Sequence, residues 1–138
     1  MPVAHILLAD QHIGRPNKTY GHTDTDGSDD INEHVELSGP ATAPFIFTAP
    51  HDRAHHRLTD GVLQRKMSEP GTGALARFLA EELDGLSAVN ISDVGDANWD
   101  AQHPLKELLD ERGCVTTGAY LIDLHGMTDQ HGIDIAIG

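Results

Sequence analysis

The stretch Pro44-Phe45-Ile46-Phe47-Thr48-Ala49, followed at once by Pro50-His51, determines the fold class that we expect for this chain. A short apolar run that contains aromatic residues and stops at a proline is typical of a buried strand. The sequence therefore predicts a strand at 44–49. Outward from this strand, further apolar patterns indicate helices and strands on its C-terminal side and one strand near the N-terminus.

Downstream of this strand, apolar residues repeat at the spacing of one helical face. Ser68 or Thr72 can cap the start of this helix with a side-chain oxygen. Gly85 can close the helix in the left-handed conformation. The residues of the apolar face are Leu75, Phe78, Leu79 and Leu83.

A second helix is predicted to begin at Pro104, because proline is favoured at the first helical position, and to end at Gly113. Cys114 follows at a helix-to-strand corner and is the only cysteine, so no intrachain disulfide is possible. We expect Cys114 to be a small, semi-buried residue rather than a nucleophile. The apolar stripe of the helix consists of Leu105, Leu108 and Leu109.

Strands that alternate with these helices indicate an α/β fold with a largely parallel sheet. The 138 residues fit a single domain, 1–138. Within it, the polar segment 14–39 is expected to be irregular or edge structure. The further strands are predicted at 3–9, 88–91, 120–124 and 133–137.

Active sites in such sheets gather just beyond the carboxyl ends of the strands. This rule selects the residues that follow Ala49, Ile91 and Leu124 as candidates. Polar side chains occur at all three places.

The net charge of −13 excludes some classes of partner. Binding to a phosphate backbone needs clustered basic residues, and so does docking on an anionic membrane surface. We therefore expect neither nucleic acid nor membrane as a partner. No segment approaches the length of an apolar membrane span, so a soluble cytoplasmic protein is the default expectation.

His51 comes directly after the predicted strand at 44–49, where the strand holds it at the crevice. Imidazole nitrogens on rigid supports are common zinc ligands. His55 lies four residues further on, and a helix would place both histidines on one face. Because this segment need not be helical, His55 and His56 are interpreted as polar loop residues or substrate contacts.

His125 ends the predicted strand at 120–124, and Gly126 allows the backbone to turn sharply beside a bound ion. Asp123 points to the same side of that strand as His125. Its carboxylate can orient the imidazole by a hydrogen bond or can cap a neighbouring helix. His125 is therefore either a metal ligand or a packed histidine at a strand end.

A metal site at these histidines needs a third ligand. Glu69 is one candidate, because it lies just before the predicted helix near 72–83. A glutamate at that place is also explained by its favourable interaction with a helix N-terminus, without any metal. The rivals for the same role are Asp52, Asp60 and His55.

Asn98 and Asp100 lie in the loop that follows Ile91. They are candidates for binding polar groups of a substrate. An alternative of equal weight is a turn stabilised by their side chains, with Trp99 packed on the fold.

With these residues assembled, the chain resembles the N-formylglutamate amidohydrolase family. The wider kin of that family are the zinc carboxypeptidases and the succinylglutamate desuccinylase and aspartoacylase group. The similarity covers most of residues 44–138. The matching stretches are Thr48-Ala49-Pro50-His51, Glu69-Pro70-Gly71-Thr72-Gly73-Ala74-Leu75-Ala76, Asp96-Ala97-Asn98-Trp99-Asp100 and Leu121-Ile122-Asp123-Leu124-His125-Gly126-Met127.

The resemblance implies a phosphorylase/hydrolase-like three-layer fold, with a mixed sheet flanked by helices. It also implies one Zn²⁺ held by His51, Glu69 and His125. The family's usual His-x-x-Glu pair is absent, since Ala54 stands at the glutamate position. The implied activity is hydrolysis of an amide bond in a small N-acyl amino acid or peptide-like substrate.

Two departures from the family affect catalysis. Trp99 replaces the arginine that often follows the substrate-contacting asparagine, so Arg53, Arg57 or Lys66 must supply any charge for a substrate carboxylate. No glutamate follows His125 to act as general base. The acids that remain there are Asp129, our candidate base, and Asp134, and the candidate stabilising donor is His131 or a histidine of the 55–56 pair.

Three explanations of the missing glutamate remain open: a different base, a degenerate site, or a piece of a longer relative. The runner-up function is accordingly a shortened, inactive metal-binding relative. A short sheet with an open edge strand tends to pair with another chain, which predicts a homo-oligomer, in particular a dimer.

Overall fold

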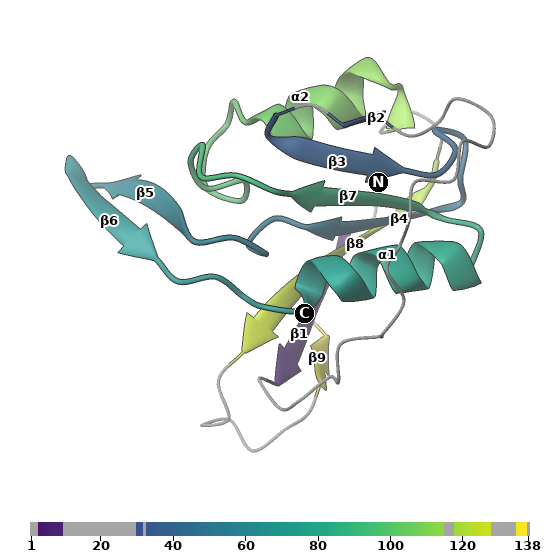
Figure 1. The fold of residues 1–138 in the computed structure, drawn as a ribbon, viewed down its shortest axis with the longest axis horizontal. Coiled ribbons are helices and arrows are strands. Elements are labelled where there is room, and N and C mark those ends of the chain that lie inside the picture. Colours follow the sequence, from purple (N-terminus) through teal and green to yellow (C-terminus); the bar gives the residue numbers. More distant parts are fainter. Residues whose placement is uncertain (1–2, 10–29, 32, 115–117, 128–134, 138) are drawn as a thin grey trace.

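The computed structural model describes residues 3–9, 30–31, 33–114, 118–127 and 135–137. Within these residues several strands precede the first helix, after which helices and strands alternate as far as the last pair of strands (Figure 1). Their order is β1 (Val3–Ala9), β2 (Asp30–Ile31), β3 (Val35–Ser38), β4 (Phe45–Ala49), β5 (His55–Thr59), β6 (Val62–Lys66), α1 (Thr72–Glu82), β7 (Leu86–Asn90), α2 (Pro104–Glu111), β8 (Tyr120–Met127) and β9 (Ile135–Ile137).

The main sheet has seven strands in the order β2-β3-β7-β4-β8-β1-β9. The four central strands β7, β4, β8 and β1 run parallel, whereas β2, β3 and β9 pair antiparallel with their neighbours. This arrangement confirms the predicted α/β class with a mixed, largely parallel sheet.

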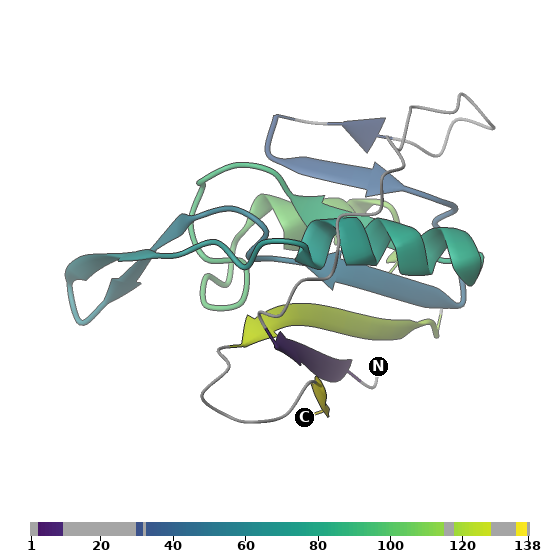
Figure 2. The same ribbon diagram turned by 60° about the horizontal axis from the view of Figure 1, so that its bottom comes forward.

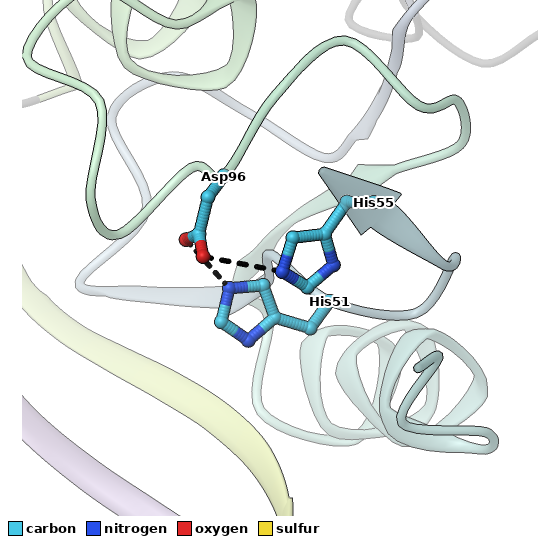
Figure 3. Close-up of side chains that lie close together, drawn as sticks. All are labelled: His51, His55 and Asp96. Carbon is cyan, nitrogen blue, oxygen red and sulfur yellow. Dashed lines mark hydrogen bonds and ion pairs between the residues drawn. The ribbon is translucent and has the colours of Figure 1, made fainter. Parts of the chain in front are cut away.

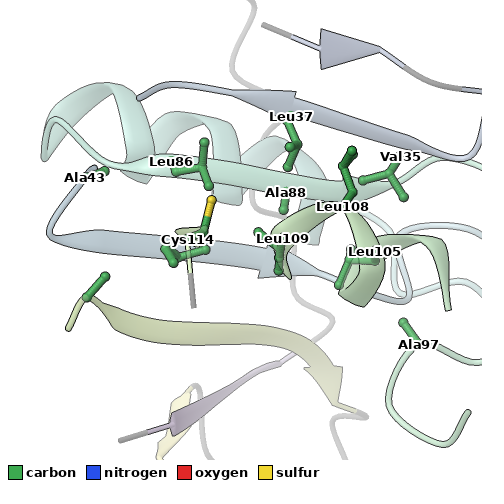
Figure 4. Close-up of a cluster of buried hydrophobic side chains, with 12 residues drawn as sticks. Val35, Leu37, Ala43, Leu86, Ala88, Ala97, Leu105, Leu108, Leu109 and Cys114 are labelled. Carbon is green, nitrogen blue, oxygen red and sulfur yellow. The ribbon is translucent and has the colours of Figure 1, made fainter. Parts of the chain in front are cut away.

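One helix covers each face of this sheet. Alternate residues of a strand point to opposite faces, so Ile46 and Phe47 of β4 enter different clusters of buried side chains. Ile46 belongs to the cluster that includes Leu105, Leu108 and Leu109 of α2, most of which is labelled in Figure 4. Phe47 lies with the cluster beneath α1.

Helix α1 packs on the sheet mainly through small side chains, and only part of the predicted apolar face contributes. Phe78 and Leu83, which we assigned to that face, are 40% and 47% exposed. Leu75 and Leu79 are only partly buried. Small residues allow a helix to approach a sheet closely, and the larger apolar side chains then remain partly or largely exposed. The buried residues of α1 are Thr72, Gly73, Ala76 and Ala80.

Both predicted caps of α1 are wrong in detail. Gly71 occupies the N-cap without a side-chain hydrogen bond, and Asp52 instead accepts from the backbone N–H of Gly73 at 2.9 Å. At the other end the left-handed residue is Asp84, with a φ of 49°. Gly85 follows it and packs under Phe47, where a Cβ would lie 2.9 Å from the ring.

Helix α2 begins at Pro104 and buries its three leucines as predicted. Gly113 follows the helix with a φ of 69°, which is a conformation that favours glycine. Cys114 is fully buried in the α2 cluster.

The sequence analysis did not identify two strand features. Within the segment 14–39, Val35 and Leu37 alternate with less buried residues and form β3. Strands β5 and β6 form a separate two-stranded hairpin. Its turn is Asp60-Gly61, a pair typical of tight hairpin turns, and both residues have positive φ. In the described part of the chain, neither helix is long and apolar enough to cross a membrane.

Candidate metal centre

The carboxyl ends of three parallel strands bring the candidate residues together. His51 follows β4, Asp96 lies in the loop after β7, and His125 lies near the end of β8. Glu69 reaches the same place from the segment before α1, where its backbone N–H donates to the carbonyl of His51 at 2.8 Å. The residues that the strand-end rule selected therefore lie together at one edge of the sheet.

Two histidines converge on the carboxylate of Glu69. Nδ1 of His51 lies 3.2 Å from Oε1, and Nδ1 of His125 lies 3.2 Å from Oε2. Neighbouring ligand atoms of a tetrahedral zinc site, with bonds of about 2.0–2.1 Å, are about 3.3 Å apart. The two imidazole rings are tilted by 60°, so their lone pairs can point toward one ion. The donor set and its spacing fit a small divalent cation.

The second nitrogen of each histidine is held by another carboxylate. Nε2 of His51 lies 3.0 Å from Oδ1 of Asp96, and Nε2 of His125 lies 3.1 Å from Oδ2 of Asp123. Thr48 in turn donates to Asp123 at 2.5 Å. A carboxylate at Nε2 fixes the ring and directs Nδ1 toward a metal. The predicted contact between Asp123 and His125 is confirmed.

Gly126 serves a different purpose from the sharp turn that we expected. Strand β8 continues through His125 to Met127, because it pairs with β1 as far as Ala9. A Cβ on Gly126 would lie 3.0 Å from Cβ of Glu69. The absence of a side chain lets Glu69 approach the strand, where its Oε2 accepts from the Gly126 N–H at 2.9 Å.

A second group of side chains also lies close enough to bind an ion, namely His51, His55 and Asp96 (Figure 3). The rings of His51 and His55 stack with centroids 4.3 Å apart and planes only 13° apart. In-plane lone pairs of stacked rings run parallel and do not converge. Oδ2 of Asp96 also accepts from Nε of Arg57 at 2.5 Å. This group is therefore better suited to holding His51 than to chelating a metal.

The histidines and carboxylates of the site stabilise one another's charged forms, as the directions of their pKa shifts indicate. Burial alone lowers the pKa of His125, but hydrogen bonds with Asp123 and Glu69 outweigh it and raise that pKa to about 10. Burial opposes ionisation of Glu69, yet hydrogen bonds from His125, His51 and the Gly126 N–H lower its pKa to about 2. The pKa of His51 is also raised, since its bonds with Glu69 and Asp96 exceed the effect of burial. Without a metal, protonated imidazoles satisfy the carboxylates.

The stability of the metal-free protein should therefore fall as the pH rises above neutrality. The pKa of His125 is about 10 in the folded chain against 6.5 ordinarily. Its contribution is fully present below the lower value and is lost as the pH rises through the higher one. Glu69, whose pKa is lowered, contributes above its ordinary value and loses this contribution only in acid.

Thermal unfolding in the presence of a chelator measures this dependence. We expect a lower melting temperature at each step from about pH 6.5 to 10, and a flatter profile for His125→Gln. Added Zn²⁺ should stabilise more strongly as the pH rises, since it needs neutral imidazoles. A metal-free profile that rises over this range would contradict the assigned ion pairs.

The other predicted site residues lie at varied distances from this centre. The side-chain nitrogen of Asn98 lies 2.8 Å from Nε2 of His125 and 3.0 Å from Oδ2 of Asp123. Asp100 accepts from the Asp96 N–H at 2.8 Å and so stabilises the loop. His55 is buried beside Asp96, whereas Arg53 is exposed in the loop before β5.

Asp129 and His131, our candidates for base and donor, lie outside the described residues. Among the rivals of Glu69 as third ligand, Asp52 caps α1, and Asp60 lies at the hairpin turn. His51, Glu69 and His125, the predicted set, are brought together.

Sequence reasoning missed Asp96 as a buried partner of the site. Its side chain is fully buried, and its pKa is lowered because hydrogen bonds from His51 and Arg57 outweigh the effect of burial. The Asp96-Ala97-Asn98-Trp99-Asp100 stretch was a signal, since Oδ1 of Asp96 accepts from the N–H of Asn98 as in an Asx turn.

Comparisons with protein-family models, curated proteins and solved structures find no match for this chain. The functional argument therefore rests on the site itself. Buried histidine and carboxylate side chains lie close enough together to bind a metal ion in the described part of the chain.

Proposed function

We propose that this chain is a zinc-dependent amidohydrolase of the N-formylglutamate amidohydrolase type. His51, Glu69 and His125 would hold the ion. One observation carries the proposal: both histidines direct Nδ1 at the Glu69 carboxylate with 3.2 Å spacing, at the carboxyl edge of the sheet. The substrate class is a small N-acyl amino acid or a peptide-like amide.

Zinc suits this donor set better than magnesium or calcium. Two imidazoles and one carboxylate match catalytic zinc sites with three protein ligands, whereas the harder cations prefer oxygen ligands. A bound zinc ion supplies Lewis-acid activation of a water molecule and of the substrate carbonyl. A helix on each face of a mixed sheet supports the phosphorylase/hydrolase-like three-layer architecture in the proposal.

The surrounding side chains would divide the remaining tasks. Asp96 and Asp123 hold the two imidazoles in orientation through Nε2. Asn98 offers an amide beside His125 for polar groups of the substrate. Asp129 would accept the proton from the attacking water and return it to the leaving amine, with His131 as a stabilising donor.

The second candidate function is a catalytically inactive metal-binding relative. It is favoured because each described acidic side chain at the centre already forms hydrogen bonds or ion pairs with neighbouring side chains. Glu69 bridges the two histidines, Asp96 binds His51, His55 and Arg57, and Asp123 binds His125 and Thr48. Catalysis therefore depends on a base supplied from elsewhere in the chain.

A hydrolysis screen with N-formyl and N-acetyl amino acids, using zinc-loaded protein, separates these functions. The enzyme predicts turnover that Glu69→Ala abolishes. It also predicts that Asp129→Asn retains zinc but loses about 100-fold or more in rate. Asp93→Asn, an exposed acid paired with His56, is the matched control and should stay active. Bound zinc without any turnover would favour the inactive relative, and no bound zinc would contradict both.

A further inference from the structure

The β5–β6 hairpin extends away from the body of the molecule, and we refer to residues 53–66 as the arm (Figures 1 and 2). Leu58 and Leu63 are cross-strand partners on the arm and are 57% and 65% exposed. Two leucines that remain exposed to water bury little apolar surface and so stabilise the hairpin little. An isolated two-stranded hairpin is in any case only marginally stable. The exposed pair on one face of the arm therefore suits a contact with another surface.

The arm is basic in a strongly acidic protein. It holds four of the nine lysines and arginines, namely Arg53, Arg57, Arg65 and Lys66, and one acid, Asp60, while the chain as a whole has a net charge of −13. Arg57 is already paired with Asp96, so the other three cations give the arm its basic character. Arg65 is exposed, and because strand residues two apart share a face, it lies beside Leu63. One face of the arm thus combines two leucines with a cation.

The C-terminal end of α1 has the complementary character. Phe78 and Leu83 are exposed there, and Glu82 and Asp84 are exposed beside them. Phe78 and Glu82 are four residues apart and share a face of the helix. The C-terminus of a helix carries partial negative charge, and the last turn of α1 contains no basic residue. Acidic side chains at this end of a helix destabilise it unless a cation from another segment or another molecule pairs with them.

We propose that the arm of one copy of this chain docks on the C-terminal end of α1 in a second copy. Leu58 and Leu63 would pack against Phe78 and Leu83, and Arg65 would pair with Glu82. The charge complementarity of the two surfaces selects a second copy as the occupant, since the same chain presents both halves.

This interface is head-to-tail rather than a symmetric pairing of sheet edges. The arm and the C-terminal end of α1 lie at opposite ends of the molecule in Figures 1 and 2, so one copy cannot satisfy both. Contacts of this kind generate closed rings or open filaments. The proposed interface differs from the dimer by pairing of open edge strands that we expected from the sequence.

A charge-reversal cycle measured by sedimentation velocity across micromolar concentrations tests the interface. Wild type should show masses above the monomer that grow with concentration and shrink with added salt. Arg65→Glu and Glu82→Arg should each weaken association by about tenfold or more, because like charges then oppose each other. The double variant should regain association. Glu111→Arg, the same change at the last residue of α2, should leave association unchanged.

Circular dichroism of each variant establishes that the fold is retained before association is compared. A wild type that stays monomeric throughout would overturn the proposal. Oligomers that persist unchanged in both single variants would overturn it too, as would a double variant that stays as weak as the single ones.

Discussion

Replacing His125 with Ala is expected to remove zinc binding from this protein. One of the three proposed ligand side chains is lost, and Glu69 keeps only His51 as a partner among the proposed ligands. The loss of affinity should exceed about 100-fold, which is the upper end for loss of a residue that only orients a ligand. Competition with a chromophoric chelator at constant pH measures the change.

Two further variants grade this effect. Asp96→Asn leaves all three ligands in place but weakens the hydrogen bond that orients His51, so it should cost about 10- to 100-fold in affinity. His56→Ala removes a half-buried histidine that pairs with the exposed Asp93, and this variant should bind zinc as the wild type does. Equal zinc affinity in His125→Ala and His56→Ala would contradict the assigned ligand set.

Truncation of Phe47 to Ala should produce the largest loss of stability. Phe47 lies on the central strand β4, is 1% exposed, and fills the space beneath α1 as far as Gly85. Phenylalanine-to-alanine changes in such cores cost about 3–5 kcal/mol, because they lose buried apolar area and leave a cavity. The melting temperature should fall by about 10 °C or more.

Phe78→Ala is the matched control for this truncation. It removes the same atoms from a side chain that is 40% exposed on the outer face of α1. In dilute solution its free energy of unfolding should change by less than about 1 kcal/mol. Similar losses for both variants in calorimetry would contradict the assignment of Phe47 to the core beneath α1.

Apolar runs and strand ends were sufficient to predict much of this molecule. The runs at 44–49 and 120–124 became adjacent parallel strands. His51 and His125 could be located because parallel strands deliver their carboxyl ends to one edge of a sheet. Helix α2 was predictable since Pro104 and Gly113 mark its limits.

Other features depend on packing between segments that are distant in the sequence, and the periodicity of apolar residues does not reveal such contacts. Glu69 reaches His51 only because the hairpin between them returns the chain to the end of β4, as the bond from the Glu69 N–H to the His51 carbonyl records. The buried carboxylate of Asp96 pairs with Arg57, which is 39 residues away. Helix α1 packs on the sheet through its small residues, and Phe78 is exposed as a result.

The most direct test of the metal centre is the metal content of the wild-type protein, purified without an affinity tag and measured by mass spectrometry. The proposal predicts close to one zinc ion per chain, either as isolated or after zinc is added and the excess is removed. A protein that retains no zinc after this treatment would contradict the assignment of His51, Glu69 and His125 as ligands, and with it the proposed hydrolase.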